Sequence, residues 1–445
     1  MVGAMEQAGG DLVVLGGGPA GAVSAILGLR DGLRVTLVSP APVPSRAGRL
    51  EGLSPRLHQW LAREGLLNGF DGITGPLPRR VDWAGISGSN REFVVDRAAL
   101  DAHLCALAEA RGARRVTGTG RIVGSGESAK RSVLLSDGRR VFPDWIIDAR
   151  GRSAPRMASG AASLGRMPAT VALCGWLEGD VSGVEAGIAL CALPQGWLWR
   201  VALPDGRIWA QFLGDAADPE PAPARLVAAI TAGTRCAPAP TLRLAGPLIA
   251  REAAPRLPAP VTDLRCLPVG DAFAAMDPLS GHGQFWAVSS ALAAAAARRT
   301  LTADPASEDR CLRYLRERAA ETAWRMARVG RDFLALETRF SGQPFWAARR
   351  ALPDSLPAHE SREGFAVAQA LVIDNGLITE REVLKTPCSP AGIGWFGRLP
   401  APEIYRLAQA GPEALRQRFG PQAEALLAAI ESERTSPHQR VENPS

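Results

Sequence analysis

The sequence has no long apolar run and no basic segment ahead of its first apolar stretch. None of its apolar stretches reaches about 18 residues, and the alanine-rich stretch 287–297 is too short and too weakly hydrophobic to cross a bilayer. The first residues also lack the positively charged region that begins a secretory signal. We therefore expect a cytoplasmic protein without a membrane partner.

Patterns that bind metal ions are missing as well. The seven cysteines form no CxxC pair, and the five histidines have no metal-ligand spacing, so we expect no metal site and no disulfide framework. The net charge of +6 is carried by arginine, because Lys130 and Lys385 are the only lysines. No basic run contains the interleaved aromatic residues of a nucleic-acid face, so we expect no nucleic-acid partner. The positive excess fits an anionic cofactor or an acidic partner.

The start of the chain has the pattern of a nucleotide-binding unit. Residues 11–39 predict a strand, a glycine-rich turn, a helix and a second strand. The turn consists of Gly16, Gly17, Gly18, Pro19, Ala20 and Gly21. Its GxGxxG spacing allows a tight turn, close approach of the backbone to a pyrophosphate and close helix packing, and the helix start adds free N–H groups. The sequence therefore predicts a dinucleotide site.

One position departs from the usual pattern of such sites. The acidic residue expected at the end of the second strand, where it would hold the adenine ribose, is replaced by Ser39. A serine can still bond a ribose hydroxyl, but it cannot repel a 2′-phosphate. This motif by itself leaves FAD and NADP both open.

A second glycine-rich segment lies far downstream and favours FAD. It contains Gly270-Asp271 and then the turn Pro278, Leu279, Ser280, Gly281, His282, Gly283 and Gln284 before a helix. The segment resembles the second flavin fingerprint of the FAD-dependent monooxygenases of the p-hydroxybenzoate hydroxylase and tryptophan halogenase-like superfamily. The resemblance implies that Gly270 and Asp271 close on the ribityl chain. It also implies that the helix start faces the isoalloxazine, where its dipole would stabilise a reduced flavin.

Two weaker features agree with this resemblance. Residues 94–113 predict a helix with Asp96 as its cap, closed near Gly112. Arg97 at its start resembles the arginine that faces the cofactor in the superfamily, although it could also be a surface arginine. Arg150 stands where many hydroxylases carry aspartate, a departure from the superfamily pattern that leaves direct NADPH handling open.

Within the superfamily, the motifs point to two groups. Residues 196–200, GWLWR, resemble the WxW element of flavin-dependent tryptophan halogenases, but the lysine that engages hypohalous acid in those enzymes has no counterpart in the lysine-free segment 52–97. We therefore expect no halogenation. Residues 277–295 and 388–400 resemble flavoproteins that mature tryptophylquinone cofactors, namely the monooxygenase serving quinohemoprotein amine dehydrogenase and the partner flavoproteins of lysine and glycine oxidases.

The resemblance and the strand pattern together predict an α/β fold. We expect a Rossmann-like FAD-binding domain of the p-hydroxybenzoate hydroxylase type, with an inserted antiparallel β-sheet substrate domain and a helical C-terminal region. The FAD-binding parts are placed at 1–80, 94–165 and 261–305. The substrate-domain strands are placed at 81–93 and 166–260, and the C-terminal helical region at 306–445.

The implied reaction is the hydroxylation of an electron-rich aromatic ring through a C4a-hydroperoxide of FAD formed with O₂. The substrate implied is a tryptophan side chain of a peptide or protein, an immature quinoprotein subunit. Electrons would come from NAD(P)H or from a separate reductase. Three alternatives stay open: a small-aromatic hydroxylase, a reductase of the geranylgeranyl reductase type, and a non-catalytic flavoprotein chaperone of an oxidase subunit.

Four side chains are candidates for work on the substrate. His282 in the flavin turn is the candidate for proton transfer, or else a histidine that fills a tight turn and bonds the backbone. Trp197 and Trp199 share one face of a strand and, with Trp286, could line an aromatic cavity, although core packing is the other common fate of such residues.

Overall fold

The structure is a computed structural model that describes residues 12–41, 48–124, 131–155, 167–180, 183–233, 242–258, 260–358 and 364–434. The chain divides into two compact units. Unit 1 is Met1–Ala295 with Leu315–Ser355, and unit 2 is Ala296–Tyr314 with Leu356–Ser445. No helix among the described residues is long and apolar enough to cross a membrane.

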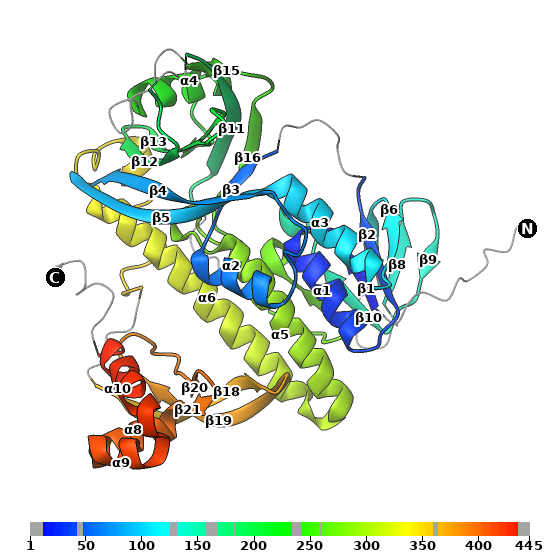
Figure 1. Cartoon of the computed structure of the whole chain (residues 1–445). Coiled ribbons are helices and arrows are strands. Elements are labelled where there is room, and N and C mark those ends of the chain that lie inside the picture. The colour runs from blue at the N-terminus through cyan, green and yellow to red at the C-terminus, as the bar shows by residue number, and fades with distance from the viewer. Residues whose placement is uncertain are drawn as a thin grey trace, which may run out of the picture. The chain divides into compact units, whose positions relative to one another are not determined.

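Unit 1 contains a five-stranded parallel sheet in the order β17-β10-β1-β2-β6 (Figure 1). Its strands are β1 (Leu12–Leu15), β2 (Val35–Ser39), β6 (Arg114–Thr117), β10 (Trp145–Asp148) and β17 (Cys266–Pro268). Every residue of β1 and β2 is buried, as expected for a parallel sheet that is covered on both faces. The helix α1 (Pro19–Arg30) connects β1 to β2 and contacts α3 (Arg97–Ala110).

A small antiparallel sheet of β7 (Gly120–Val123), β8 (Ser132–Leu135) and β9 (Arg140–Val141) packs on the parallel sheet. Pro143 lies between β9 and β10, the second of which belongs to the parallel sheet. Proline has no N–H for a ladder hydrogen bond, which explains why the chain leaves one sheet here and enters another. The predicted cap of α3 is confirmed, because Asp96 accepts hydrogen bonds from the N–H groups of Ala98 and Ala99.

The second sheet of unit 1 has nine strands and is mostly antiparallel, with β12 and β4 as a parallel pair. Its order is β15-β11-β14-β13-β12-β4-β5-β3, and β16 pairs with β11. Its strands are β3 (Leu50–Leu53), β4 (Ile73–Trp83), β5 (Ile86–Asp96), β11 (Thr170–Gly179), β12 (Gly187–Leu193), β13 (Gly196–Ala202), β14 (Ile208–Asp215), β15 (Leu242–Leu244) and β16 (Ile249–Glu252). This sheet is therefore built from two chain segments, β3–β5 and β11–β16, which are separated in the sequence by the strands β6 and β10 of the parallel sheet.

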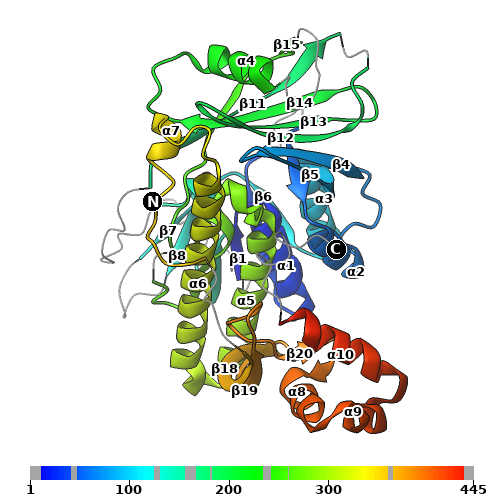
Figure 2. The ribbon, with the colours of Figure 1, turned by 90° about the vertical axis from the view of Figure 1, so that its left-hand side faces the viewer.

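The two faces of this sheet bury different sets of side chains. The helix α4 (Ala222–Ala232) covers one face, where its apolar side chains pack with Leu198 and Phe212 (Figure 2). On the other face Trp197, Trp199 and Val201 pack in a cluster that includes residues of α7 (Pro344–Ala347). This alternation along β13 follows from the two-residue period of a strand.

The remaining helices of unit 1 are α2 (Pro55–Arg63) and parts of α5 (Gly283–Ala303) and α6 (Glu308–Leu336). Unit 2 has its own apolar core beneath α8 (Ala401–Ala410), α9 (Pro412–Phe419) and α10 (Ala423–Ser432). It also contains the antiparallel pairs β18 (Ala366–Asp374) with β19 (Leu377–Lys385), and β20 (Trp395–Phe396) with β21 (Leu399–Pro400). These strands are an addition to the helical region that the sequence predicts.

One cysteine differs from the expectation of free thiols. Cys191 on β12 is disulfide-bonded, whereas Cys105, Cys174, Cys266, Cys311 and Cys388 are free. No group of three or more candidate ligands that could hold a metal ion occurs among the described residues.

Candidate active site

The glycine-rich turn after β1 is packed so tightly that side chains are excluded from it. Gly16 has a φ of +112°, and a Cβ there would lie 2.2 Å from the carbonyl oxygen of Ala149. A Cβ on Gly21 would lie 1.9 Å from the carbonyl oxygen of Gly16. Gly18 caps α1 without a side-chain partner, so the first N–H groups of the helix remain available to a ligand.

A cavity of about 700 Å³ begins at this turn and extends to the nine-stranded sheet. Of the residues that the sequence predicts for the cofactor or the substrate, those that line it are Gly18, Pro19, Ala20, Arg97, Trp197, Trp199, Gly270, Asp271, Pro278, Gly281, Gly283 and Gln284. Gly16 and Gly21 lie behind the lining, where they allow the turn to form. The residues that lie outside it are Ser39, His282 and Trp286.

The residues around the turn fit a bound dinucleotide. Gly18 leaves open the space that a Cβ would occupy, 3.3 Å from Nη2 of Arg97. Ser39 at the end of β2 is 4% exposed, and its hydroxyl has no hydrogen-bond partner among the described residues. A buried hydroxyl without a partner is unusual, and a ligand hydroxyl would satisfy it.

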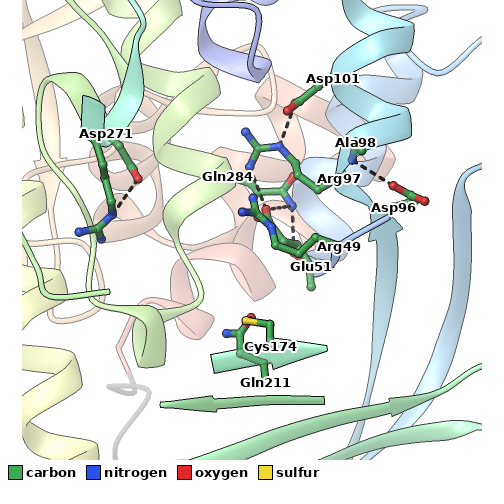
Figure 3. Close-up of polar contacts among 12 residues, drawn as sticks. Arg49, Glu51, Asp96, Arg97, Ala98, Asp101, Cys174, Gln211, Asp271 and Gln284 are labelled. Atoms are coloured by element: carbon green, nitrogen blue, oxygen red, sulfur yellow. Dashed lines mark hydrogen bonds and ion pairs between the residues drawn. The ribbon is translucent and has the colours of Figure 1, made fainter. Parts of the chain in front are cut away.

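Arg97 is the centre of a charged network beside the turn (Figure 3). Its Nη1 lies 2.9 Å from Oε2 of Glu51, and its Nε lies 2.8 Å from Oδ1 of Asp101. Glu51 also forms an ion pair with Arg49 and accepts a hydrogen bond of 3.0 Å from Nε2 of Gln284 at the start of α5. The first turn of α5 is therefore tied to β3 and α3 through one carboxylate.

The two carboxylates around Arg97 differ in their pKa. Burial acts to raise the pKa of Glu51, but Arg97 and Arg49 outweigh it, so this pKa lies below its usual range. Burial outweighs Arg97 at Asp101 and raises that pKa. Glu51 is therefore the more firmly ionised partner of Arg97.

The second predicted fingerprint lines the same cavity next to the first, since a Cβ on Gly270 would lie 3.0 Å from Cβ of Ala20. Gly270 has a φ of +58°, and its N–H donates a 2.8 Å hydrogen bond to Oγ of Ser290 on α5. Asp271 faces Arg152, whose Nε lies 3.3 Å from Oδ2. Burial raises the pKa of Asp271 although Arg152 acts against it. The geometry brings the two fingerprints, far apart in the sequence, to one cavity.

Asp277 directly precedes the turn of the second fingerprint and caps it. Its Oδ1 accepts a 2.9 Å hydrogen bond from the N–H of Leu279, which caps the short turn Pro278–Ser280. A Cβ on Gly330 of α6 would lie only 2.5 Å from Cγ of Asp277, so this glycine makes room for the carboxylate. Burial raises the pKa of Asp277 to about 6, and the residue belongs to the cavity lining.

The sheet side of the cavity is formed by β11, β13 and β14. Trp197 and Trp199 lie on β13. Cys174 on β11 and Gln211 on β14 are directly paired in the register of these two strands. The Sγ of Cys174 lies 3.5 Å from Oε1 of Gln211 (Figure 3). Burial raises the pKa of Cys174 to about 12, so the thiol stays protonated. This wall offers aromatic surface and one amide.

Two sequence-based candidates lie away from the cavity. His282 is exposed, and its Nδ1 contacts the carbonyl oxygen of Ser280 within its own turn. The indole of Trp286 is 2% exposed, and its N–H donates a 3.1 Å hydrogen bond to the carbonyl oxygen of Gly270. In this structure both side chains stabilise turns around the cavity, and their roles in proton transfer and substrate contact stay predictions.

Several lining residues escape the sequence analysis. They are Arg49, Glu51, Arg79, Glu92, Cys174, Gln211 and Asp277. Most lie on strands of the nine-stranded sheet, where no short motif marks them, and the register of distant strands decides which of them meet. Asp277 carries a weak signal, because it is an acidic residue directly before the flavin turn.

Comparison with known proteins identifies the family. The tryptophan halogenase family matches residues 78–374. The chain is 32% identical to the solved structure of QhpG, a peptidyl tryptophan dihydroxylase essential for tryptophylquinone cofactor biogenesis, with a TM-score of 0.72 over 96% of this chain and 99% of that one. The flavin-dependent halogenase CmlS shares the fold, with a TM-score of 0.68 over 96% of each chain at 17% identity.

A shorter match links the chain to the menaquinone reductase of Mycobacterium tuberculosis. The two are 34% identical over 161 residues, which cover 33% of this chain and 38% of that protein. The chain thus matches well under half of that relative's length. The family match covers most of the chain and agrees with the resemblance in the flavin fingerprints. The chain is therefore an FAD-dependent oxidoreductase that belongs to the tryptophan halogenase family.

Proposed function

We propose that the chain is an FAD-dependent monooxygenase that hydroxylates a tryptophan side chain of a peptide or protein during tryptophylquinone cofactor biogenesis. The observation that carries the proposal is that the glycine-rich turn and the indoles of Trp197 and Trp199 line the same cavity. The likeness to a peptidyl tryptophan dihydroxylase over nearly the full length supports the choice of substrate.

Halogenation is disfavoured in spite of the family name. The segment 52–97, in which halogenases carry their lysine, contains none. The basic residue that β4 presents at the cavity is Arg79, whose Nε lies 3.3 Å from Oε2 of Glu92. A guanidinium stays protonated at any working pH and is a poor nucleophile toward hypohalous acid.

In this proposal the glycine-rich turn and the start of α1 bind the pyrophosphate, and Ser39 bonds the adenine ribose. Gly270, Asp271 and Arg97 hold the remaining part of the cofactor. When bound, FAD supplies redox chemistry and the activation of O₂. Gln284, anchored on Glu51, keeps the start of α5 in place beside it. In the proposed division, residues 1–80, 94–165 and 261–305 bind FAD, 81–93 and 166–260 bind substrate, and 306–445 form the C-terminal region.

The substrate side of the proposal uses Trp197 and Trp199 to stack on an indole ring and exclude water. Gln211 lies on the same wall, and its amide can accept a hydrogen bond from the indole N–H. These groups would fix which ring carbon faces the flavin. No metal is required, because an indole is already electron-rich.

Asp277 replaces His282 as the group that we propose to accept the proton lost by the hydroxylated ring carbon. Asp277 is part of the cavity lining, and a pKa of about 6 leaves its carboxylate ionised yet basic near neutral pH. His282 retains only a role in the turn.

The proposal is tested by reducing the purified FAD-loaded protein anaerobically with NADH, NADPH or a reductase and then adding oxygen with a tryptophan-containing peptide. We expect flavin bleaching, followed by a gain of oxygen atoms on the indole measured by mass spectrometry with isotopically labelled dioxygen. The Trp199→Phe variant should hydroxylate more slowly, while the control Trp324→Phe, outside the cavity lining, should not. Unlabelled peptide after full flavin turnover would refute the proposal.

A second candidate is a flavin-dependent reductase, favoured by the local identity to menaquinone reductase. A reductase would transfer electrons to a quinone or an isoprenoid double bond without consuming oxygen. Anaerobic turnover with menaquinone therefore separates the two candidates. Flavin binding without either reaction would instead indicate a chaperone of an oxidase subunit.

A further inference from the structure

Arg200 lies on β13 but on the opposite face from Trp197 and Trp199. It lines a second cavity, of about 330 Å³, that is separate from the candidate active site. In the register of the sheet Arg200 pairs with Ala189 of β12, and Ala189 pairs with Arg80 of β4. The strands β13, β12 and β4 are neighbours in the sheet (Figure 2), so the two arginines flank one small residue on one face.

The guanidinium of Arg200 has no partner among the described residues and lines this second cavity. The residue is 4% exposed, and within the described part of the chain it has no hydrogen bond, ion pair or ring contact. Burial lowers the pKa of Arg200, and no carboxylate opposes this effect. An uncompensated buried charge destabilises a folded protein, so such a group is normally paired or binds a ligand.

The other buried arginines of the described residues follow the normal rule. Arg225, Arg331 and Arg349 each contact an aspartate. Arg298 has a partner as well. Arg200 is therefore the exception in a chain that otherwise pairs its buried guanidinium groups.

The carboxylate in the second cavity does not neutralise Arg200. Glu185 pairs with Arg80 at 3.2 Å, and its side chain is 82% exposed. The walls next to Arg200 are apolar or small, and include Val184 and Ala202. A ligand that enters would thus meet one desolvated guanidinium and a second one that can leave its exposed partner.

We propose that this second cavity binds an oxyanion, a carboxylate or a phosphate group, through Arg200 with Arg80 as the second cation. The planar fork of a guanidinium binds both groups in a bidentate manner, and the bond strengthens when water is excluded. A volume near the lower limit of ligand pockets suits a single anionic group and not a second dinucleotide. The site lies on the face opposite the flavin cavity, so it acts as a recognition or effector site and not in the chemistry.

The test is calorimetric titration of the FAD-loaded protein with inorganic phosphate, with acetate and with a glutamate-containing peptide, in buffer of constant chloride concentration. Saturating FAD fills the glycine-rich turn, so added anions report on other sites. The variant is Arg200→Met, which keeps the volume of the stem and removes the charge. The matched control is Arg243→Met on β15 of the same sheet, where the arginine is 78% exposed and pairs with Glu178.

We expect one anion site per chain in the wild type and in the control, and affinity weakened by about tenfold or more in Arg200→Met, as for the loss of a charged hydrogen bond. Tighter binding of the peptide and acetate identifies a carboxylate source, and tighter binding of phosphate identifies a free anion. Without added oxyanion, Arg200→Met should melt no lower than the wild type, because it removes an unpaired charge. Absent anion binding, or equal binding by Arg200→Met and the wild type, overturns the proposal, whatever the outcome of the hydroxylation assay.

Discussion

Replacing Asp277 by asparagine tests both the proposed proton acceptor and the physical cause of its pKa. Burial raises the pKa of Asp277 from 3.8 to about 6, a difference that corresponds to about 3 kcal/mol between its charged and neutral forms. Because the folded value lies above the unfolded one, the folded chain keeps a proton between about pH 4 and pH 6 that the unfolded chain has released. The contribution of Asp277 to stability is therefore greatest below about pH 4 and is lost as the pH rises through about 6.

Asparagine removes the charge but can still accept the N–H of Leu279 through its amide oxygen. At pH 8 the free energy of unfolding of Asp277→Asn should thus rise by up to about 3 kcal/mol, and at pH 5 by about half as much, since pH 5 lies between the unfolded and folded pKa values. The hydroxylation rate should fall, and the increase in rate with pH centred near 6 in the wild type should disappear. Urea unfolding at saturating FAD and pH–rate profiles measure the two effects.

Asp304→Asn provides the matched control. Asp304 caps the short turn Pro305–Ser307 by accepting the N–H of Ala306, as Asp277 does for Leu279, but it lies outside the cavity lining. The variant Asp304→Asn should leave the pH–rate profile of hydroxylation unchanged. Two results would refute the reasoning: an unaltered profile in Asp277→Asn, or a loss of stability at pH 8 equal to that of the control.

Three further variants test the remaining parts of the site. Glu51→Gln should weaken FAD binding and lower the free energy of unfolding by about 2 kcal/mol, because Arg97, which is 22% exposed, keeps one partner fewer. Since the pKa of Glu51 is lowered, this loss relative to wild type should shrink as the pH falls through that pKa. Acid titrations followed by flavin fluorescence measure it. Gly16→Ala should yield protein without flavin, whereas Gly69→Ala, also at positive φ but with free space around it, should keep its flavin absorbance. His282→Ala should retain hydroxylation close to wild type in the peptide assay, and a large loss would return the imidazole to the mechanism.

Local features of the chain could be predicted well, because they depend on residues that are neighbours in the sequence. The glycine spacing of the first turn corresponds to a backbone at Gly16 that admits no side chain. The cap at Asp96 and the alternation of Trp197 and Trp199 on one face of β13 are also confirmed. The flavin fingerprints and their glycines sufficed to identify the superfamily, which the family match confirms.

The sequence does not predict which side chain in or near the flavin turn is turned toward the cavity. His282 has the right chemistry and lies in the flavin turn, yet its side chain is exposed. Asp277, five residues earlier, belongs to the cavity lining, and the absence of a side chain on Gly330 of α6 leaves room for its carboxylate. The direction of a side chain in a turn depends on what packs against it, and that partner is more than fifty residues away.

By itself the sequence determined which segment forms the nucleotide-binding turn and which strands alternate, because these properties follow from periodicity and from the steric demands of glycine. The cofactor class came from the resemblance of the second glycine-rich segment to a flavin fingerprint. The tertiary structure alone decided that Glu51, Arg97 and Gln284 form one charged network and that Arg200 is buried without a partner. Burial and pairing arise when distant strands and helices meet, and the same arginine would be an ordinary solvated cation in any arrangement that left it exposed.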